Sequence, residues 1–295
     1  MNNMKKFIIS SRPKQMTKNL LIFVPLFFTI DIWISYSYTD IQMIISKSIF
    51  TFLSFCCCSI IGYQINDFID RNLDKFHYVK KNRPIAKNQI KYLELFLFIF
   101  LVFIVGGFFA YLVNINVLFL FIIYLLLSIL YSYIFKNYFL MDLIFIVVFY
   151  IVRMSAGTIA ISFDISIWLY ILTGVSSFLI ITIKRVSESK NNLNNTRSNI
   201  SFYRNNVFKK IIFFLGIITC FTYLIYSVLE VFENQKNWIF ILTSFFFFMG
   251  IIRYIQLTND GSKGEFPEEI ILKDKYIFLS IMFFFLFILV SLINN

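Results

Sequence analysis

Long apolar runs are the feature that most restricts the fold of this 295-residue chain. Each run approaches the roughly 20 helical residues, at about 1.5 Å per residue, that cross a hydrocarbon core of ~30 Å. The runs cover residues 20–38, 44–65, 92–113, 116–135, 138–162, 166–183, 211–230, 237–257 and 276–293. They lack the alternating polar positions of a membrane β-barrel. We therefore predict an all-α integral membrane protein with about nine transmembrane helices, forming one domain over residues 1–295.

Basic residues indicate which side of the membrane each connection faces. With the N-terminus in the cytoplasm, 24 of the 27 Lys and Arg residues fall in cytoplasmic segments, as the positive-inside rule requires. Lys47 and Lys236 fall outside, and Arg153 lies within a span. This one-sided charge suits anionic head groups or phosphorylated substrates. We therefore expect membrane lipid, but no nucleic acid, as a partner.

An acidic run follows the second apolar stretch and reads Asn66-Asp67-x-x-Asp70-x-x-x-Asp74. At about 100° per residue, the three carboxylates fall within roughly 60° of one helical face. Carboxylates gathered in this way repel one another unless a cation lies between them. One explanation is pairing with basic residues of a solvated loop, namely Arg71, Lys75, Lys80 and Lys81. The explanation that we favour is a Mg²⁺ site completed by substrate phosphate oxygens.

Basic residues follow the acidic run closely, at His77, Lys80, Lys81 and Arg83. A metal–diphosphate complex needs both kinds of group: carboxylates for the ion, and cations for the oxygens that the ion leaves uncovered. Ordinary positive charge facing the lipid surface is the alternative for any one of them. Pro84 makes Arg83 the more specific position, because proline fixes the backbone and ends any helix there.

The acidic and basic segments together resemble the first Asp-rich motif of the UbiA superfamily of intramembrane prenyltransferases. The pattern N-D-x-x-D-x-x-x-D followed by H-x-x-K-x-x-R-P-I-A is similar to the branch that makes polyprenyl-phosphate phosphoribose, the decaprenyl-phosphate phosphoribosyltransferase-like enzymes. Further segments resemble that branch: 12–19, Tyr131-Ser132, Arg153-x-x-Ala156-Gly157, Lys184-Arg185-x-x-Glu188, Arg253-Tyr254, 266–268 and 273–274. Departures from the branch are Met16, Tyr78 and Asn88, and none of them is an expected metal ligand.

The resemblance implies a UbiA-like bundle in a bacterial cytoplasmic membrane, with the active site facing the cytoplasm. It implies Mg²⁺-dependent transfer of 5-phosphoribosyl from phosphoribosyl diphosphate to a polyprenyl phosphate. Asp67, Asp70 and Asp74 would be catalytic, holding Mg²⁺ and the donor's diphosphate together with Asn66. The donor phosphates would be neutralised by His77, Lys80, Lys81 and Arg83. The acceptor phosphate would be held by Lys14, Lys18, Lys184 and Arg185, with Glu188 orienting the cations and Tyr131 contacting ribose or a phosphate.

The loop after the sixth span bears on the choice of substrate. Members of the superfamily that use prenyl diphosphates resemble one another in carrying a second D-x-x-x-D motif there. In this chain residues 184–190 hold one acid and three bases, which suits a lipid monophosphate; snorkelling at a helix end is the alternative. The second function considered is transfer of a prenyl group from prenyl diphosphate to an aromatic or other acceptor. A transporter ranks third, because the ionisable groups gather on one face.

Arg153 is the deepest basic residue, about ten positions into its span and therefore roughly 15 Å from the inner surface. A charge at that depth costs several kcal/mol, so it is expected to face the bundle interior with a partner. Asp31 in the first span is one such partner, and a substrate phosphate is the other.

Overall fold

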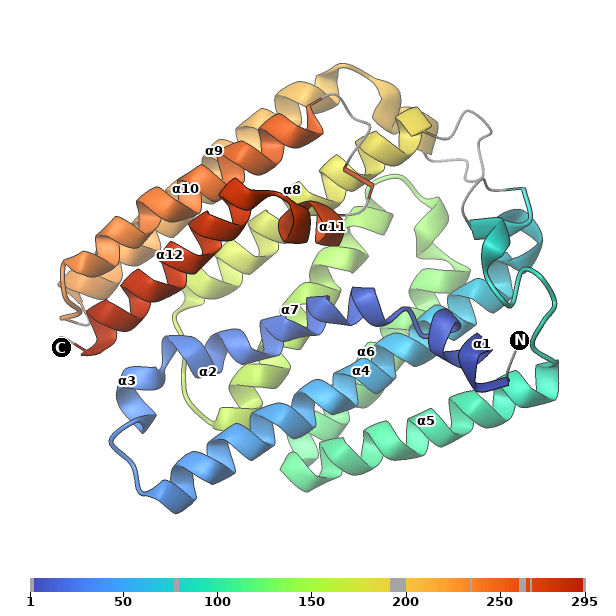
Figure 1. The fold of residues 1–295 in the computed structure, drawn as a ribbon, viewed down its shortest axis with the longest axis horizontal. Helices are drawn as coiled ribbons and strands as arrows, with labels where there is room; N and C mark the ends of the chain where they lie inside the picture. Colours follow the sequence, from blue (N-terminus) through green and yellow to red (C-terminus); the bar gives the residue numbers. More distant parts are fainter. Residues whose placement is uncertain are drawn as a thin grey trace. The chain divides into compact units, whose positions relative to one another are not determined.

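The computed structural model describes residues 3–76, 80–191, 200–233, 235–259, 264–265 and 267–293. Over these ranges the regular structure is helical, without strands. Within the described ranges, seven helices are long and apolar enough to cross a membrane. They are α4 (Tyr38–Asp74), α5 (Tyr92–Val113), α6 (Ile115–Tyr133), α7 (Met141–Ile161), α8 (Ile167–Asn191), α9 (Val207–Phe232) and α10 (Ile239–Thr258) (Figure 1). The prediction of an all-α membrane protein is confirmed.

The two remaining predicted spans differ from the other seven. The last one corresponds to α12 (Lys275–Ile293), whose apolar stretch Lys275–Ser291 is shorter than the other seven spans. The first one is broken into the 3-10 helix η1 (Pro13–Phe23), α2 (Val24–Phe28) and α3 (Ile30–Trp33). Thr29 ends α2 because its backbone leaves the helical region and its hydroxyl donates to the carbonyl of Pro25 at 2.9 Å. The count of nine is therefore not confirmed, and the side on which the N-terminus lies stays a prediction.

The chain divides into two compact units. Among the described residues, the first unit contains 3–29 and 36–164, and the second contains 30–35, 165–191 and those from 200 onward. The expectation of a single domain over the whole chain stays a prediction.

In the first unit, α4 is the helix around which the others pack. It contacts α1 (Asn3–Ser10), η1, α5, α6 and α7. Its buried face carries small side chains such as Ser48 and Thr51 alongside Phe55, and small residues let membrane helices approach closely. Phe55 and Phe121 of α6 are fully buried in the core of this unit.

In the second unit, α9 packs against α8 and α10, and α12 packs against α10. Hydroxyl groups join α9 to α10: the Tyr223 hydroxyl lies 2.7 Å from that of Thr243, and Ser227 lies 2.9 Å from Ser244. Such bonds satisfy polar groups that lipid cannot solvate. The shorter elements of this unit are η4 (Ile200–Arg204), which contacts α8, and α11 (Pro267–Lys273), which contacts α12.

Polar caps and turns determine where the long helices of the first unit begin. Ser37 caps α4 by accepting from the backbone N–H of Asp40, and Asn114 caps α6 by accepting from that of Val117 at 2.8 Å. Asn88 has a φ of 54°, a left-handed conformation that asparagine tolerates better than most residues. The turn at Asn88 leads into α5.

Candidate active site

The three carboxylates of the acidic run lie at the end of α4. The helix continues without a break from its apolar part to Asp74, so the spacing of three and four residues puts Asp67, Asp70 and Asp74 on one face. That face is turned inward, because the three residues are only 1%, 6% and 5% exposed. Buried carboxylates require charged or hydrogen-bonding partners, and each of the three has one.

Two arginines pair with Asp67 and Asp74. Arg12, at the start of η1, forms an ion pair with Oδ1 of Asp67. Arg83 donates to the same oxygen at 2.9 Å and to Oδ2 of Asp74 at 2.7 Å. One nitrogen of the guanidinium, Nη1, therefore bridges two of the carboxylates. Such charge-assisted hydrogen bonds are the stronger ones in proteins.

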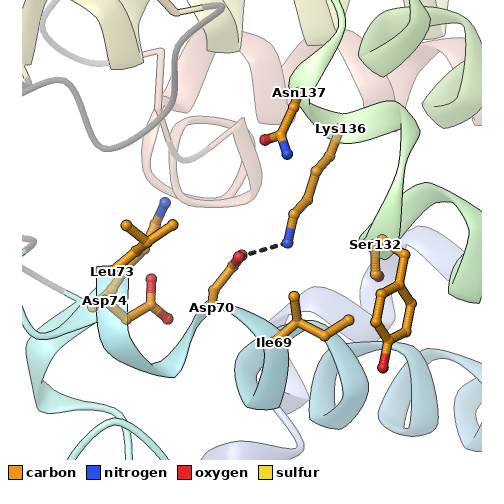
Figure 2. A pocket seen from close by; sticks show the side chains of 9 residues that line it. Ile69, Asp70, Leu73, Asp74, Ser132, Lys136 and Asn137 are labelled. Carbon is orange, nitrogen blue, oxygen red and sulfur yellow. Dashed lines mark hydrogen bonds and ion pairs between the residues drawn. The ribbon is translucent and has the colours of Figure 1, made fainter.

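Lys136 is the partner of Asp70. It belongs to η3 (Phe135–Asn137), between α6 and α7, and is 4% exposed. Its ammonium lies 2.5 Å from Oδ1 of Asp70 and 3.4 Å from Oδ1 of Asn66. Figure 2 shows Lys136 reaching from its turn toward Asp70 on α4.

A cavity of about 150 Å³ adjoins this ion pair. Its charged lining consists of Asp70, Asp74, Lys80 and Lys136. The other lining residues are Ile69, Leu73, Ser132, Tyr133 and Asn137 (Figure 2). A cavity that presents carboxylates and ammonium groups together has donors for an anion and ligands for a hard cation.

The pKa values of the two arginines are shifted in opposite directions. Burial lowers the pKa of Arg83 below its ordinary value, and the neighbouring charge of Arg12 acts in the same direction. Burial also acts to lower the pKa of Arg12, but the charge of Asp67 and the hydrogen bond to it raise that pKa overall. Both guanidinium groups remain charged, since arginine does not lose its proton in proteins. The cluster thus carries its own counter-cations.

The residues present fit a magnesium ion that is bound partly by the protein and partly by water and substrate phosphates. Over the described ranges, no group of three or more His, Cys, Asp or Glu side chains is close enough to hold a metal by itself. Mg²⁺ rarely needs such a cage, because it is usually bound by one or two carboxylates with water and substrate phosphates. Asp70 and Asp74 supply two carboxylates to one cavity.

The structure brings some of the predicted site residues to this cavity and leaves others apart. Lys80 lines it, Asn66 contacts Lys136, and the exposed Lys81 is next to Lys80 in η2 (Lys80–Asn82). Tyr131 packs against the rings of Phe145 and Phe149. Lys14 and Lys18 are on η1, and His77 lies outside the described residues.

The predicted acceptor residues of α8 belong to the second unit. Arg185 and Glu188 are 4% and 3% exposed and form an ion pair at 2.6 Å. Lys184 precedes them and is half-buried. Glu188 is thus paired with Arg185, and the orienting role of Glu188 and the roles of Lys184 and Arg185 in binding stay predictions.

Arg153 has partners that the sequence did not indicate. Its guanidinium donates to Asn19 Oδ1 at 2.7 Å, to the carbonyl of Phe149 at 3.0 Å and to the hydroxyl of Tyr124. Asp31 was one of the two partners considered from the sequence. It belongs to the second unit, where its Oδ2 lies 3.9 Å from Nζ of Lys236.

Sequence reasoning missed Arg12 and Lys136 as members of the site. Arg71 was one of the bases considered as partners of the acidic run. Its guanidinium instead stacks on the rings of Phe68 and Tyr92. The sequence did contain a hint that Arg12 belongs to the site, since Arg12-Pro13 repeats the Arg-Pro dipeptide at 83–84. Lys136 carried one too, as the single basic residue of its predicted connection.

Comparison with known proteins agrees with this fold. The model of the UbiA prenyltransferase family matches residues 22–266. Decaprenyl-phosphate phosphoribosyltransferase of Mycolicibacterium smegmatis is 23% identical over 285 residues, which are 93% of this chain and 88% of that protein. The protein of that name from Mycobacterium tuberculosis is 22% identical over 270 residues, 90% and 86% of the two chains.

Solved structures show the same architecture. A UbiA homologue from Archaeoglobus fulgidus bound to GPP and Mg²⁺ has a TM-score of 0.73 at 18% identity, covering 97% of this chain and 99% of that one. The fold and the site therefore define a helical membrane transferase. The chain belongs to the UbiA prenyltransferase family.

Proposed function

We propose that this protein transfers 5-phosphoribosyl from phosphoribosyl diphosphate to a polyprenyl phosphate in a Mg²⁺-dependent reaction. The observation that carries the proposal is the cavity at the end of α4, where two buried carboxylates and two lysines line one space. Relatives named decaprenyl-phosphate phosphoribosyltransferase match about nine tenths of the chain, which supports this donor and acceptor.

The donor's diphosphate is assigned to this cavity. Asp70 and Asp74, with Asp67 and Asn66 beside them, would hold Mg²⁺, and the A. fulgidus homologue is a family member bound to that ion. The ion supplies positive charge that stabilises a departing diphosphate. Further phosphate oxygens are assigned to Lys80 and Lys136, which line the cavity, and to the other bases predicted from the sequence, Lys81, Arg83 and His77.

The exchange at the sugar needs little proton transfer. An oxygen of the lipid phosphate attacks C1 of the ribose, the bond between C1 and the diphosphate oxygen breaks, and pyrophosphate leaves. The lipid phosphate is already an anion near neutral pH, so a strong general base is unnecessary. The chain's cations stabilise the negative charge that develops on the leaving group.

The acceptor phosphate is assigned to the other basic residues predicted from the sequence, Lys14, Lys18, Lys184 and Arg185, with Glu188 orienting Arg185. Tyr131 is assigned to the ribose or a phosphate. The polyprenyl tail would lie among apolar helices, with the site facing the cytoplasm of a bacterial inner membrane.

Prenyl transfer from a prenyl diphosphate to an aromatic or other acceptor is the second candidate. It is favoured by the structural neighbours bound to GPP and DMAPP. The segment at 184–190, with one acid and three bases, argues against it, because a second metal set for the allylic diphosphate would need more carboxylates there.

Incubation of the purified protein with labelled phosphoribosyl diphosphate and a polyprenyl phosphate tests the proposal. We expect a lipid-extractable ribose product that requires Mg²⁺ and is absent with the matched Asp70→Asn variant. No such product, together with turnover of prenyl diphosphate and an aromatic acid, would reverse the order of the two candidates.

A further inference from the structure

The N-terminal segment η1 has an unusual conformation. It runs for 11 residues as a 3-10 helix, whereas such helices seldom exceed three or four residues because their hydrogen bonds are poorly aligned. Arg12 at its start has a φ of 51°, a conformation that a residue with a side chain adopts at a cost. A segment of this kind keeps its place through contacts with the helices around it.

Asn19 is the polar anchor of η1. It is completely buried, and its amide nitrogen lies 3.3 Å from Cys56 Sγ and 3.3 Å from Ser59 Oγ, both on α4. Its amide oxygen accepts from Arg153 on α7 at 2.7 Å. One side chain therefore joins η1 to two helices at once.

Arg153 holds the side chain of Asn19 in place. It is 4% exposed, and the hydrogen bonds that the structure describes for it go to neutral groups on η1, α6 and α7. Its guanidinium also lies 5.0 Å from the centre of the Tyr124 ring. A buried cation held by several neutral acceptors fixes the relative positions of the segments that supply them.

Gly157 brings the backbone of η1 against α7. A Cβ atom at residue 157 would lie closer than 3.0 Å to the carbonyl oxygen of Ile22, which is backbone and cannot rotate away. Any larger residue would therefore push the end of η1 off α7. Asn19 and Gly157 thus hold the same segment by a polar and a steric contact.

The other end of η1 is at the carboxylates. Arg12 pairs with Asp67 and stacks on the ring of Tyr63 at 4.9 Å. Seven residues of 3-10 helix separate Arg12 from Asn19, which is about 14 Å at roughly 2.0 Å per residue. Arg153, bonded to Asn19, therefore contacts the opposite part of η1 from Arg12.

We propose that Arg153, Asn19 and Gly157 are positioning residues for diphosphate binding. They fix η1 against α4 and α7, and η1 in turn keeps the guanidinium of Arg12 at Asp67, within about two helical turns of the carboxylates that line the cavity. From there Arg12 is assigned to an oxygen of the bound diphosphate. This inference rests on the proposed function, since it takes the cavity to be a diphosphate site. It gives Arg153 a different role from the direct phosphate contact expected from the sequence.

Binding of inorganic pyrophosphate at saturating Mg²⁺, measured by calorimetry on the full-length protein, provides the readout. Pyrophosphate is the part shared by phosphoribosyl and prenyl diphosphates, so the result does not depend on which donor is used. Loss of the guanidinium in Arg12→Ala should weaken binding about tenfold or more, as expected for one charge-assisted hydrogen bond. Gly157→Ala should weaken it to a similar extent.

Gly107→Ala is the matched control, because the nearest atom to a Cβ there is 4.0 Å away. It should bind pyrophosphate as the unmodified protein does. Asn19→Asp keeps the oxygen that accepts from Arg153 and should retain more affinity than Asn19→Ala. If Gly157→Ala does not fold, the two Asn19 variants decide the question.

The double variants separate positioning from direct contact. In an Arg12→Ala background, Gly157→Ala, Asn19→Ala and Arg153→Met should each change the affinity by less than about twofold. Full additive losses in that background would overturn the inference while leaving the proposed function intact. Failure of the unmodified protein to bind pyrophosphate with Mg²⁺ would overturn the proposed function, and the inference with it.

Discussion

Replacement of Lys136 by methionine tests the charge balance of the site most sharply. Methionine keeps the apolar stem but removes the ammonium that lies 2.5 Å from Asp70. Lys136 and Asp70 are 4% and 6% exposed, so solvent cannot replace the lost partner. Removing one partner of a buried pair costs about 3–5 kcal/mol, because the remaining buried charge loses a close counter-charge.

Thermal unfolding in detergent measures this loss. In chains of this size about 1 kcal/mol corresponds to a few degrees, so Lys136→Met should lower Tm by roughly 6–20 °C. Lys87→Met, at an exposed lysine of the same unit, should change Tm little. Adding Asp70→Asn to Lys136→Met should recover most of the loss, since neutral replacement of a whole buried pair is often tolerated.

Magnesium provides a second readout of the same variant. Without the Lys136 ammonium, a positive charge that repels a bound cation is removed from beside Asp70. A ligand that binds only the folded protein raises Tm. Mg²⁺ should therefore raise the Tm of Lys136→Met more than that of the unmodified protein. A Lys136→Met protein as stable as Lys87→Met would refute the view that the Lys136–Asp70 pair is buried and contributes to stability.

Three further outcomes are expected. Arg83→Lys should reduce turnover at least about tenfold although the charge is kept, because Nη1 holds Asp67 and Asp74 while the rest of the planar guanidinium is assigned to a donor phosphate, and a single ammonium lacks that fixed fork of donors; steady-state kinetics with unchanged activity would contradict this. Asp67→Asn should abolish turnover while size-exclusion profiles stay unchanged, and retained activity would remove Asp67 from the site. In the second unit, the hydrogen bond from Arg253 lowers the pKa of Asp274 below its usual range, so the stability that this contact adds is complete above about pH 4 and is lost as the pH falls through that lower pKa. The Tm difference between the unmodified protein and Asp274→Asn should therefore shrink in acid, and a constant difference would argue against the pairing.

Helices were predictable from the sequence wherever apolar runs reached spanning length. Seven predicted spans correspond to seven long helices, because in a membrane a run of apolar residues has few alternatives to a helix. The run at 20–38 was read in the same way but is broken. Hydropathy carries no information on the hydrogen bond of the Thr29 hydroxyl, at the end of α2, or on the contacts of Asn19, just before the run.

The site was predictable only in its local part. The spacing of Asp67, Asp70 and Asp74 placed them on one helical face, since that depends on helix geometry alone. Arg83, the partner close in sequence, was among the predicted site residues, whereas two other partners, Arg12 and Lys136, come from 55 and 66 residues away. Such pairs depend on how η1 and η3 meet α4, which local spacing does not encode.

The central claim is that the end of α4 binds a divalent cation together with a diphosphate. Crystals soaked with Mn²⁺ and pyrophosphate test it directly through the anomalous signal of manganese. We expect a peak at coordination distance from the carboxylates of Asp70 and Asp74, with pyrophosphate oxygens completing the shell and the ammonium of Lys136 turned to the phosphate. Pyrophosphate and manganese absent from the cavity, with the three carboxylates still paired to Arg12, Arg83 and Lys136, would contradict the account.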